Sequence, residues 1–497
     1  MAYATALLAL LDIRTALVGL LAFLVLSWAL RRPRNLPPGP WEWPLLGSLP
    51  TLALASGEPY EVFLKMSKKY GPIFTLSILG QRIVVVHGYD AIKDAFQNPS
   101  LNDRPESHMI TNMLDGSVGI ASASGKVWKE QRKLSLNVFK NFGVGKSSFE
   151  DQIAREAEQL VYEMVNFKQK SFNPTKLFST SVSTIIASVI FGKRYDYDDP
   201  EFQKILAGIG RNMELIGAGA AMQFLPVTKY LGFLPSMREM QSNITTTVNF
   251  TKNIIKNHVK EFNPDDMRDF MDMYINEMKE KEDQRVETVL SLNNLVSVIN
   301  DLFVAGSETT ATTLRWGLLY MMLHPEVQTR VQQEIDTVVG RNRMPKLSNK
   351  PDMPYTEAVI LELQRLGNIV PLGVPHRASR DTSYRGYTLP KDCFIISNQW
   401  ALHTDPELFP EPEKFNPERF LNEAGEVFSP DEFIPFGIGR RVCPGEQLAK
   451  MELFIFFTYL LHQFTFKKPV DSPPLTVKGH LGITLAPQPY QVCAVPR

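Results

Sequence analysis

The ten residues 436–445, with the sequence FGIGRRVCPG, constrain this chain more than any other stretch. Gly437 and Gly439 tolerate left-handed or strained backbone angles, so the chain can fold tightly around whatever Cys443 holds. Pro444 suits the first position of a helix, which would make Cys443 the capping residue. Free N–H groups and the helix dipole favour a thiolate at that point. We therefore expect Cys443 to be a metal ligand.

A lone cysteine in a loop rich in glycine and proline is, on general grounds, more often a buried structural thiol. The spacing Phe-x-x-Gly-x-Arg-x-Cys-x-Gly changes this assessment. It resembles the haem-binding signature of the cytochrome P-450 superfamily at every diagnostic position. A cysteine thiolate is the axial ligand of oxygen-activating haem. The resemblance implies that Cys443 binds the iron of haem b and that Arg441 contacts an anionic group of the same cofactor.

Composition narrows the function. The chain has 497 residues, 44% of them hydrophobic, and Lys+Arg and Asp+Glu both total 53, so no net charge favours nucleic acid. Three widely spaced cysteines make no disulfide framework and fit a reducing compartment. No obvious linker follows residue 40, which predicts one catalytic domain over residues 41–497.

The N-terminus predicts a membrane anchor. Ala16–Leu30 is nearly unbroken in its apolar character, and a shorter apolar run, 4–11, precedes it. A span needs about 20 apolar residues, so Arg14 must snorkel or pair with Asp12. Arginines at 31, 32 and 34 follow, which places the body of the protein in the cytosol. We expect a retained transmembrane signal anchor over 1–32 and a stiff proline-rich hinge over 33–40.

The remaining pattern predicts a mainly α-helical protein with a small β-rich lobe. Ile73–Leu79 and Arg82–Val86 are expected strands around a Gly80-Gln81 turn. Helical patterns dominate from residue 150. The longest covers Leu292–Leu323 and ends at His324-Pro325, so it is long enough to cross the domain.

The middle of this long helix has the sequence AGSETT from Ala305 to Thr310. Gly306 weakens a helix interior by roughly 1 kcal/mol relative to alanine. Close packing against small residues would explain Ala-Gly alone, but it needs neither the acid nor the alcohol. The segment resembles the oxygen-activation segment of P-450s. The resemblance implies a local bulge with room for dioxygen, which Thr309 steadies while Glu308 delivers protons through water.

Three further residues match the family's structural core. Glu362 and Arg365 place opposite charges at i and i+3 of one helix, and such pairs are usually surface pairs worth little. Their position between the long helix and the cysteine loop matches the Glu-x-x-Arg pair of P-450s, with Arg419 as its third member. The resemblance implies a structural role near the haem.

The two haem propionates need cations or hydrogen-bond donors. Trp128 and Arg132 lie one helical turn apart and resemble the family's propionate-binding helix. Arg104, His376 and Arg441 match the other propionate contacts. Taken alone, His376 would be an ordinary loop histidine.

Within the superfamily, four motifs resemble the J subfamily of microsomal family two: WKEQR at 128–132, TLRW at 313–316, MPYT at 353–356 and LFIFF at 453–457. That group epoxidises and hydroxylates long-chain polyunsaturated fatty acids such as arachidonate, and oxidises some xenobiotics. The implied fold is the P-450 fold, in the endoplasmic reticulum membrane. The expected pocket is apolar and lined by the segment 110–120, Val304, Ala305, Val370, Val374 and Ile483.

Electrons must come from a partner, because the chain has no nucleotide fingerprint. The resemblance implies NADPH–cytochrome P-450 reductase and also cytochrome b5. A basic cluster would steer such acidic donors, although a solvated basic helix face is the rival explanation. It consists of Lys126, Lys129, Lys133, Lys140, Lys146 and Arg440.

These observations predict a membrane-bound haem-thiolate monooxygenase that inserts one atom of O2 into a small lipophilic substrate. Two alternatives stay open. The first is a haem-thiolate isomerase or dehydratase of lipid peroxides, which needs neither a reductase nor the Glu308-Thr309 pair. The second is a non-catalytic carrier of haem or lipid. Dependence of turnover on NADPH discriminates among them.

Overall fold

The computed structural model describes residues 15, 17–20, 22–23, 35–106, 114, 116–143, 147–216 and 232–497. Most of the predicted anchor, 1–32, lies outside these residues. Among the residues that are described, no helix is both long and apolar enough to cross a membrane. The end of the predicted hinge lies against the folded body, since Pro38 C=O accepts a hydrogen bond of 2.8 Å from Thr75 N–H.

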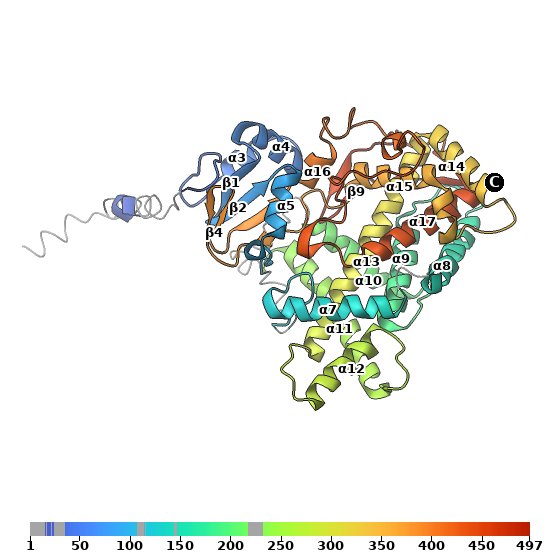
Figure 1. The fold of residues 1–497 in the computed structure, drawn as a ribbon, viewed down its shortest axis with the longest axis horizontal. Coiled ribbons are helices and arrows are strands. Elements are labelled where there is room, and N and C mark those ends of the chain that lie inside the picture. Colours follow the sequence, from blue (N-terminus) through green and yellow to red (C-terminus); the bar gives the residue numbers. More distant parts are fainter. Residues whose placement is uncertain are drawn as a thin grey trace, which may run out of the picture.

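The fold is mainly helical with small sheets, as predicted (Figure 1). The largest described sheet has four strands in the order β1-β2-β6-β3, with β2 and β6 parallel. Its strands are β1 (Ile73–Ile78), β2 (Gln81–Val86), β6 (Phe394–Ser397) and β3 (His376–Arg377). The three described two-stranded sheets pair β4 (Thr382–Tyr384) with β5 (Tyr387–Leu389), β7 (Phe464–Lys467) with β10 (Cys493–Pro496), and β8 (Gly479–Leu481) with β9 (Leu485–Pro487).

The first hairpin confirms the two predicted strands but shifts their turn by one residue. Ile78 pairs with Gln81, so the loop is Leu79-Gly80. Both loop residues have positive φ, 49° and 88°. Two-residue hairpin loops need positive φ because their twist must match that of the strands.

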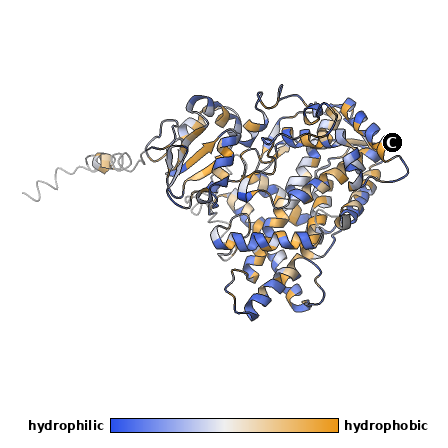
Figure 2. Ribbon diagram, in the orientation of Figure 1, coloured by the Kyte–Doolittle hydropathy of each residue, from blue (hydrophilic) through white to orange (hydrophobic). Residues whose placement is uncertain are grey.

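The described helices fill the rest of the molecule. They are α3 (Leu49–Ala53), α4 (Pro59–Tyr70), α5 (Tyr89–Gln97), α7 (Gly125–Asn141), α8 (Ser147–Val165), α9 (Thr175–Phe191), α10 (Pro200–Ile216), α11 (Pro235–Glu261), α12 (Phe270–Asp283), α13 (Leu292–Leu323), α14 (Pro325–Val338), α15 (Pro354–Gly367), α16 (Gln399–His403) and α17 (Glu446–Gln463). In Figure 2 most of them carry both orange and blue along their length, as helices with one buried face should.

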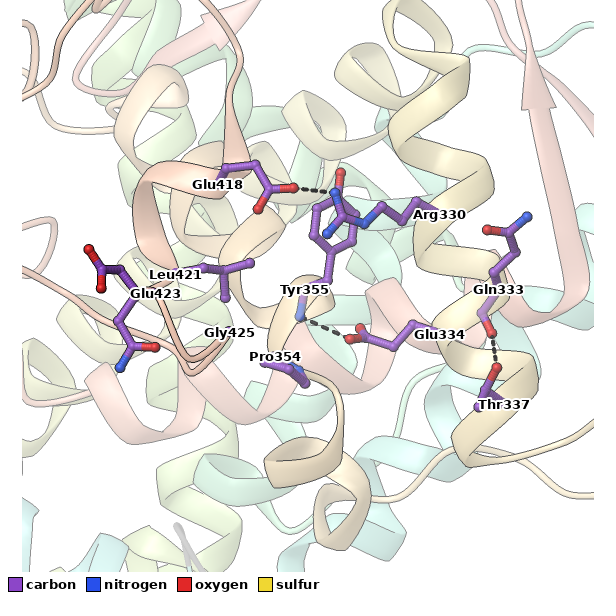
Figure 3. A pocket seen from close by; sticks show the side chains of 11 residues that line it. Arg330, Gln333, Glu334, Thr337, Pro354, Tyr355, Glu418, Leu421, Glu423 and Gly425 are labelled. Carbon is purple, nitrogen blue, oxygen red and sulfur yellow. Dashed lines mark hydrogen bonds and ion pairs between the residues drawn. The ribbon is translucent and has the colours of Figure 1, made fainter.

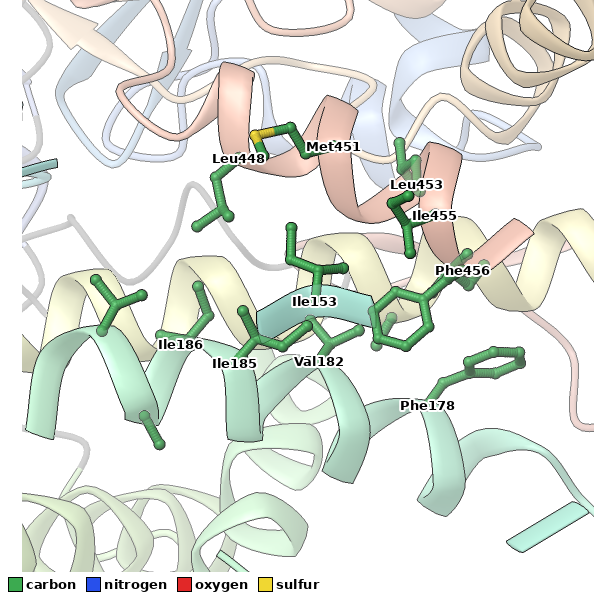
Figure 4. Close-up of a cluster of buried hydrophobic side chains, with 14 of the residues drawn as sticks. Ile153, Phe178, Val182, Ile185, Ile186, Leu448, Met451, Leu453, Ile455 and Phe456 are labelled. Carbon is green, nitrogen blue, oxygen red and sulfur yellow. The ribbon is translucent and has the colours of Figure 1, made fainter. Parts of the chain in front are cut away.

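Helix α13 has the bounds that the sequence predicts. Ser291 caps it by accepting a hydrogen bond from Asn294 N–H, and Pro325 starts the next helix. The helix packs against α9 and α17. Figure 4 shows the apolar layer between α8, α9 and α17, where Ile153, Val182 and Ile455 point toward one another. This core holds α13 and α17 in a fixed relation, and the predicted site residues lie on or near these two helices.

Candidate functional site

The cysteine loop has the tight backbone that its glycines predict. Gly437 and Gly439 have φ of 76° and 82°. A Cβ on Gly439 would lie 2.5 Å from the carbonyl oxygen of Phe96, so no larger residue fits there. Cys443 N–H donates to Phe436 C=O at 3.0 Å and closes the loop.

The expectation that Cys443 caps the following helix is wrong by two residues. Helix α17 begins at Glu446, and its N-cap is Gly445. The N–H of Cys443 donates to Phe436 C=O across the loop, so Cys443 belongs to the loop. Pro444 and Gly445 separate it from the helix. In the polypeptide alone, burial raises the pKa of the Cys443 thiol, while Gly445 N–H and Arg132 lower it by smaller amounts. A metal cation on the sulfur deprotonates such a thiol.

Three arginines gather beside this loop, and two of them lie over one indole ring. The guanidinium of Arg441 lies 4.0 Å from the ring centroid of Trp128, and that of Arg132 lies 5.9 Å from it. Arg132 also donates to the carbonyl of Val442, next to the cysteine, at 2.6 Å. Burial, with repulsion from Arg441 and Arg132, lowers the pKa of Arg104 to about 9. These four residues, predicted separately from the sequence, form one cluster.

None of the three arginines forms an ion pair within the described residues; the nearby Asp103 carboxylate, which acts to raise the pKa of Arg441, pairs with Arg377. Arg104 and Arg441 donate to backbone carbonyls, among them Val374 C=O at 2.7 Å and Ala123 C=O at 2.7 Å. Within the same residues, Trp128 Nε1 and Arg104 Nε are buried and have no hydrogen-bond partner. Buried donors of this kind are rarely left unpaired. Carboxylates fit them, so the residues present suit a cofactor with two propionates beside a thiolate ligand.

His376 adjoins this cluster but is a poor donor to a carboxylate. Its Nδ1 lies 2.9 Å from Leu101 C=O, which can only accept, so Nδ1 carries the proton of a neutral ring. Burial, together with Arg104 and Arg441, lowers the pKa of His376 well below its ordinary value. Its Nε2 would therefore donate only if an adjacent anion restored the second proton.

The predicted bulge in α13 is absent, because the segment 305–310 is α-helical throughout. Thr309 Oγ1 donates to Ala305 C=O at 2.8 Å within the helix. A Cβ on Gly306 would lie 2.7 Å from Ile186 Cδ1, so the glycine permits close packing of α9. The packing explanation of Gly306 is therefore correct.

Glu308 and Thr309 lie on different sides of α13. Thr312 Oγ1 donates to Glu308 Oε1 at 2.9 Å, and burial raises the pKa of Glu308. Ala305 is exposed although α13 is mostly buried, and Thr309 follows it one turn later. Thr309 therefore faces accessible space beside Ala305, whereas the Glu308 carboxyl is hydrogen-bonded by Thr312 of its own helix and by Thr484.

The predicted pocket residues differ in their exposure. Val304, Val370 and Ile483 are half-buried, whereas Val374 is 49% exposed. Residues 110–113 and 115 of the predicted lining lie outside the described residues. The pocket itself stays a prediction.

The structural network is assembled as the sequence predicts. Glu362 and Arg365, both fully buried, form a double ion pair with distances of 2.7 and 2.8 Å. Arg419 Nε donates to Glu362 at 3.1 Å. Sequence reasoning missed His403, whose carbonyl accepts from Arg365 at 2.8 Å and whose Nε2 accepts from Ile434 N–H at 3.1 Å. His403 thereby joins the network to the chain that leads into the cysteine loop.

A second missed group fixes the segment 117–123. Asp301 on α13 accepts from Ala121 N–H at 2.7 Å, and Ser297 contacts Ser117 between hydroxyl oxygens at 2.7 Å. A Cβ on Gly119 would lie 2.1 Å from Asp301 Oδ2, so this segment lies directly on the helix. The available signal was an aspartate inside an otherwise apolar helical stretch.

The predicted basic surface lies along α7. Lys126, Lys129, Lys133 and Lys140 are exposed, as is Arg440 in the cysteine loop, whereas Lys146 lies outside the described residues. Lys126 pairs with Glu287 at 2.9 Å. The other three lysines have no ion pair within the described parts of the chain. They are free to meet an acidic surface.

A surface groove of about 520 Å³ lies elsewhere, between α14, the start of α15 and the turn 418–425 (Figure 3). Arg330 pairs there with Glu418 and lies 3.7 Å from the ring centroid of Tyr355. Glu334 accepts from Tyr355 N–H at 2.9 Å and so caps α15. The groove contains none of the predicted site residues.

Comparison with known proteins agrees with this geometry. Residues 37–494 match the family model Cytochrome P450. The chain is 40% identical to cytochrome P450 2J5 of Mus musculus over 493 residues, which cover 98% of this chain and 97% of the relative. It is 41% identical to cytochrome P450 2J1 of Oryctolagus cuniculus, with 97% and 96% covered, and 38% identical to cytochrome P450 2U1 of Homo sapiens, with 96% and 92% covered. The chain therefore belongs to the cytochrome P450 family and is a monooxygenase that binds a cysteine-ligated haem b.

Proposed function

We propose that this monooxygenase is anchored in the endoplasmic reticulum membrane, takes electrons from NADPH–cytochrome P-450 reductase and oxidises lipophilic substrates. Long-chain polyunsaturated fatty acids such as arachidonate are the proposed substrate class, through epoxidation and hydroxylation, with xenobiotics as further substrates. The observation that carries the proposal is the cluster beside the loop of Cys443, in which Arg132 and Arg441 lie over Trp128 and Arg104 lies near both arginines.

In this proposal Cys443 binds the iron, and the cluster holds the propionates. Bound haem supplies the activation of dioxygen, which thiolate donation assists. Arg132 links the arginine cluster to the cysteine loop, since it donates a hydrogen bond to the carbonyl of Val442 beside the cysteine. The Glu362–Arg365–Arg419 network, in which Glu362 and Arg365 are fully buried, stabilises the chain that presents the loop.

Thr309 and Glu308 serve proton delivery in this proposal. The Thr309 hydroxyl donates a hydrogen bond to Ala305 C=O on the accessible side of α13, and by turning away from this carbonyl it would offer the same proton to the space beside the helix. The raised pKa of Glu308 places this carboxyl nearer to the range in which an acid both gives and regains a proton. Val304, Ala305, Val370, Val374 and Ile483 remain the proposed substrate contacts, together with 110–120.

The proposed membrane arrangement is an anchor over 1–32, a hinge over 33–40 and a haem domain over 41–497. Trp41, Trp43, Leu45 and Leu46 are exposed directly after the hinge. Tryptophan is enriched where proteins meet the membrane interface. These side chains support a catalytic domain that rests on the cytosolic surface of the bilayer.

Replacing Thr309 with alanine is expected to uncouple the reaction. Product formation should fall by about tenfold or more, because positioned proton transfer contributes at least that much, while NADPH consumption continues and peroxide appears. The measurement is product and peroxide per NADPH in a system reconstituted with reductase.

The matched control is Thr313→Ala, one turn further along α13, where the hydroxyl donates to Thr309 C=O at 2.9 Å. It should retain the coupling of the unmodified protein. Intact coupling in Thr309→Ala would contradict the role in proton delivery. Turnover of lipid hydroperoxides without NADPH, and none with it, would instead favour the isomerase or dehydratase alternative.

Reversing two exposed charges on α7 is expected to weaken the reductase interaction. Lys129→Glu combined with Lys133→Glu should raise the reductase concentration needed for half-maximal turnover by about tenfold at low salt, since exposed charge pairs each contribute up to ~1 kcal/mol. The difference should shrink as salt rises.

The control for this experiment is Lys478→Glu, an exposed lysine outside α7, which should leave the reductase titration unchanged. Equal titrations for the double variant and the unmodified protein would show that the basic surface is only a solvated helix face. Spin-state shifts on adding fatty acids, steroids or drugs would establish the substrate class.

A further inference from the structure

Thr484 is a buried threonine in the turn that joins β8 to β9. It is 4% exposed and lies between the apolar residues Ile483 and Leu485. A valine would fill nearly the same volume without a polar group, so packing alone does not require a hydroxyl here. Burying a hydroxyl is costly unless it forms a hydrogen bond. The Thr484 side chain therefore needs a polar partner.

That partner is the carboxyl of Glu308 on α13, which forms a side-chain hydrogen bond with Thr484. Thr312, one turn further along α13, donates to the same carboxyl at 2.9 Å. A carboxylate can only accept hydrogen bonds, so both hydroxyls donate to Glu308 when it is ionised. The carboxyl is thus held between its own helix and a turn near the end of the chain.

The turn that carries Thr484 is itself fixed by two other segments. Ile483 N–H donates to Met213 C=O on α10 at 3.3 Å, and Leu485 N–H donates to Ile369 C=O after α15 at 2.9 Å. Ile483 is a proposed substrate contact. Thr484 therefore joins a segment that is proposed to meet the substrate to the acid of the oxygen-activation segment.

Few charges act on Glu308 at this place. Burial has the largest effect on its pKa and raises it, the Thr312 hydroxyl and the Arg315 guanidinium lower it, Glu214 on α10 raises it, and the Thr484 hydroxyl lowers it. Charged groups on other helices packed against α13 have other partners or lie at the surface: Lys176 at the start of α9 is exposed, Glu239 on α11 pairs with Arg211, Glu362 on α15 pairs with Arg365, and Glu452 on α17 contacts Thr310.

We propose that Thr484 is a positioning residue for Glu308, whose carboxyl its hydroxyl holds toward the turn between β8 and β9. The turn that meets the substrate at Ile483 then also sets the place from which Glu308 moves protons toward Thr309. Thr484 is buried and acts only through Glu308. This inference rests on the proposed proton delivery by Glu308 and Thr309.

The first test measures the ionisation of Glu308 in the haem-loaded protein without turnover. Its carboxyl band is the infrared difference between each protein and the same protein carrying Glu308→Gln, followed against pH. Thr484→Val removes a hydrogen bond that favours the carboxylate, so the midpoint of this titration should rise by about one pH unit. Thr484→Ser keeps the hydroxyl and should leave the midpoint unchanged.

The second test measures product per NADPH with reductase and a fatty acid. Thr484→Val should lower this ratio by about fivefold, because a displaced acid transfers protons less well, and Thr484→Ser should restore it. The pH at which the ratio changes should rise together with the infrared midpoint, and Glu308→Gln should abolish this pH dependence. The spin-state titration should show unchanged affinity for the fatty acid.

The control is Thr251→Val, which removes a buried hydroxyl on α11 that donates to Thr247 C=O of its own helix at 3.0 Å. It should match the unmodified protein in both tests. An unchanged midpoint or an unchanged ratio in Thr484→Val would overturn the inference and leave the threonine a packing role. A loss that Thr484→Ser shares would overturn it as well, since the hydroxyl would not be its cause.

Should Thr484→Val fail to fold, Thr484→Ala removes the hydroxyl without adding volume, and an unchanged midpoint in that variant would overturn the inference equally. Absence of NADPH-dependent turnover in the unmodified protein would refute the proposed reductase-driven function. That result differs from the failure of the inference, because the infrared titration still shows whether Thr484 holds the Glu308 carboxyl.

Discussion

Cys443→Ser should abolish both turnover and the red-shifted absorption of the reduced, carbon monoxide-bound haem. A serine hydroxyl does not ionise at neutral pH and cannot donate electron density as a thiolate does. The loop itself should survive, because it is closed by the bond between Cys443 N–H and Phe436 C=O and by the positive φ of Gly437 and Gly439. The expected loss therefore comes from the ligand and not from unfolding.

The measurements are the carbon monoxide difference spectrum, haem content and thermal unfolding of the purified full chain. Cys493→Ser is the matched control, since Cys493 lies in β10 and not in the cysteine loop. It should keep spectrum and activity. A thiolate spectrum in Cys443→Ser would show that another cysteine binds the iron. The proposed site would then lose its basis.

Glu362→Ala should have the second large effect, on stability and haem retention together. The substitution leaves Arg365 fully buried without its carboxylate partner. Breaking a buried pair by removing one partner costs about 3–5 kcal/mol, a large fraction of the roughly 5–15 kcal/mol that holds a typical protein folded. Arg365 is hydrogen-bonded to His403, and His403 to Ile434, so a shift of Arg365 would also displace the chain that leads into the cysteine loop.

Urea unfolding with haem absorbance as a second probe measures this effect. The control is Glu411→Ala, which removes the exposed partner of Lys414 and should cost less than about 1 kcal/mol. Equal unfolding midpoints for the two variants would mean that the buried network contributes no more than a surface pair. Loss of haem from Glu362→Ala without a change in its unfolding midpoint would mean that the network stabilises haem binding and not the fold.

Local patterns carried much of the fold prediction. The Leu292–Leu323 helix is predicted to the residue, because serine at its start and His-Pro at its end are strong boundary signals. The two strands of the first hairpin are predicted to within one residue, since alternation and a glycine turn are local properties. The absent bulge at Gly306 shows the limit of such reasoning. A glycine inside a helix permits either a bulge or a close neighbour, and only Ile186 of α9 decides between them.

The candidate site was likewise predictable only in part from the sequence. The sequence could propose Arg104, Trp128, Arg132 and Arg441 one by one, and their roles stay predictions. Their convergence into one cluster depends on three chain segments that lie far apart in sequence. The role of His403 was not predicted, because a single histidine has no local sequence feature that identifies its partners.

The sequence alone determined the family, the sulfur that is expected to bind iron, the helical class and the longest helix. These depend on short spacings that one stretch of chain contains. Tertiary structure decided where helix α17 starts, why residue 306 is glycine and which buried acid has cationic partners. Those outcomes depend on the neighbours that other segments bring, since burial and charge pairing are properties of a place in the fold and not of a position in the chain.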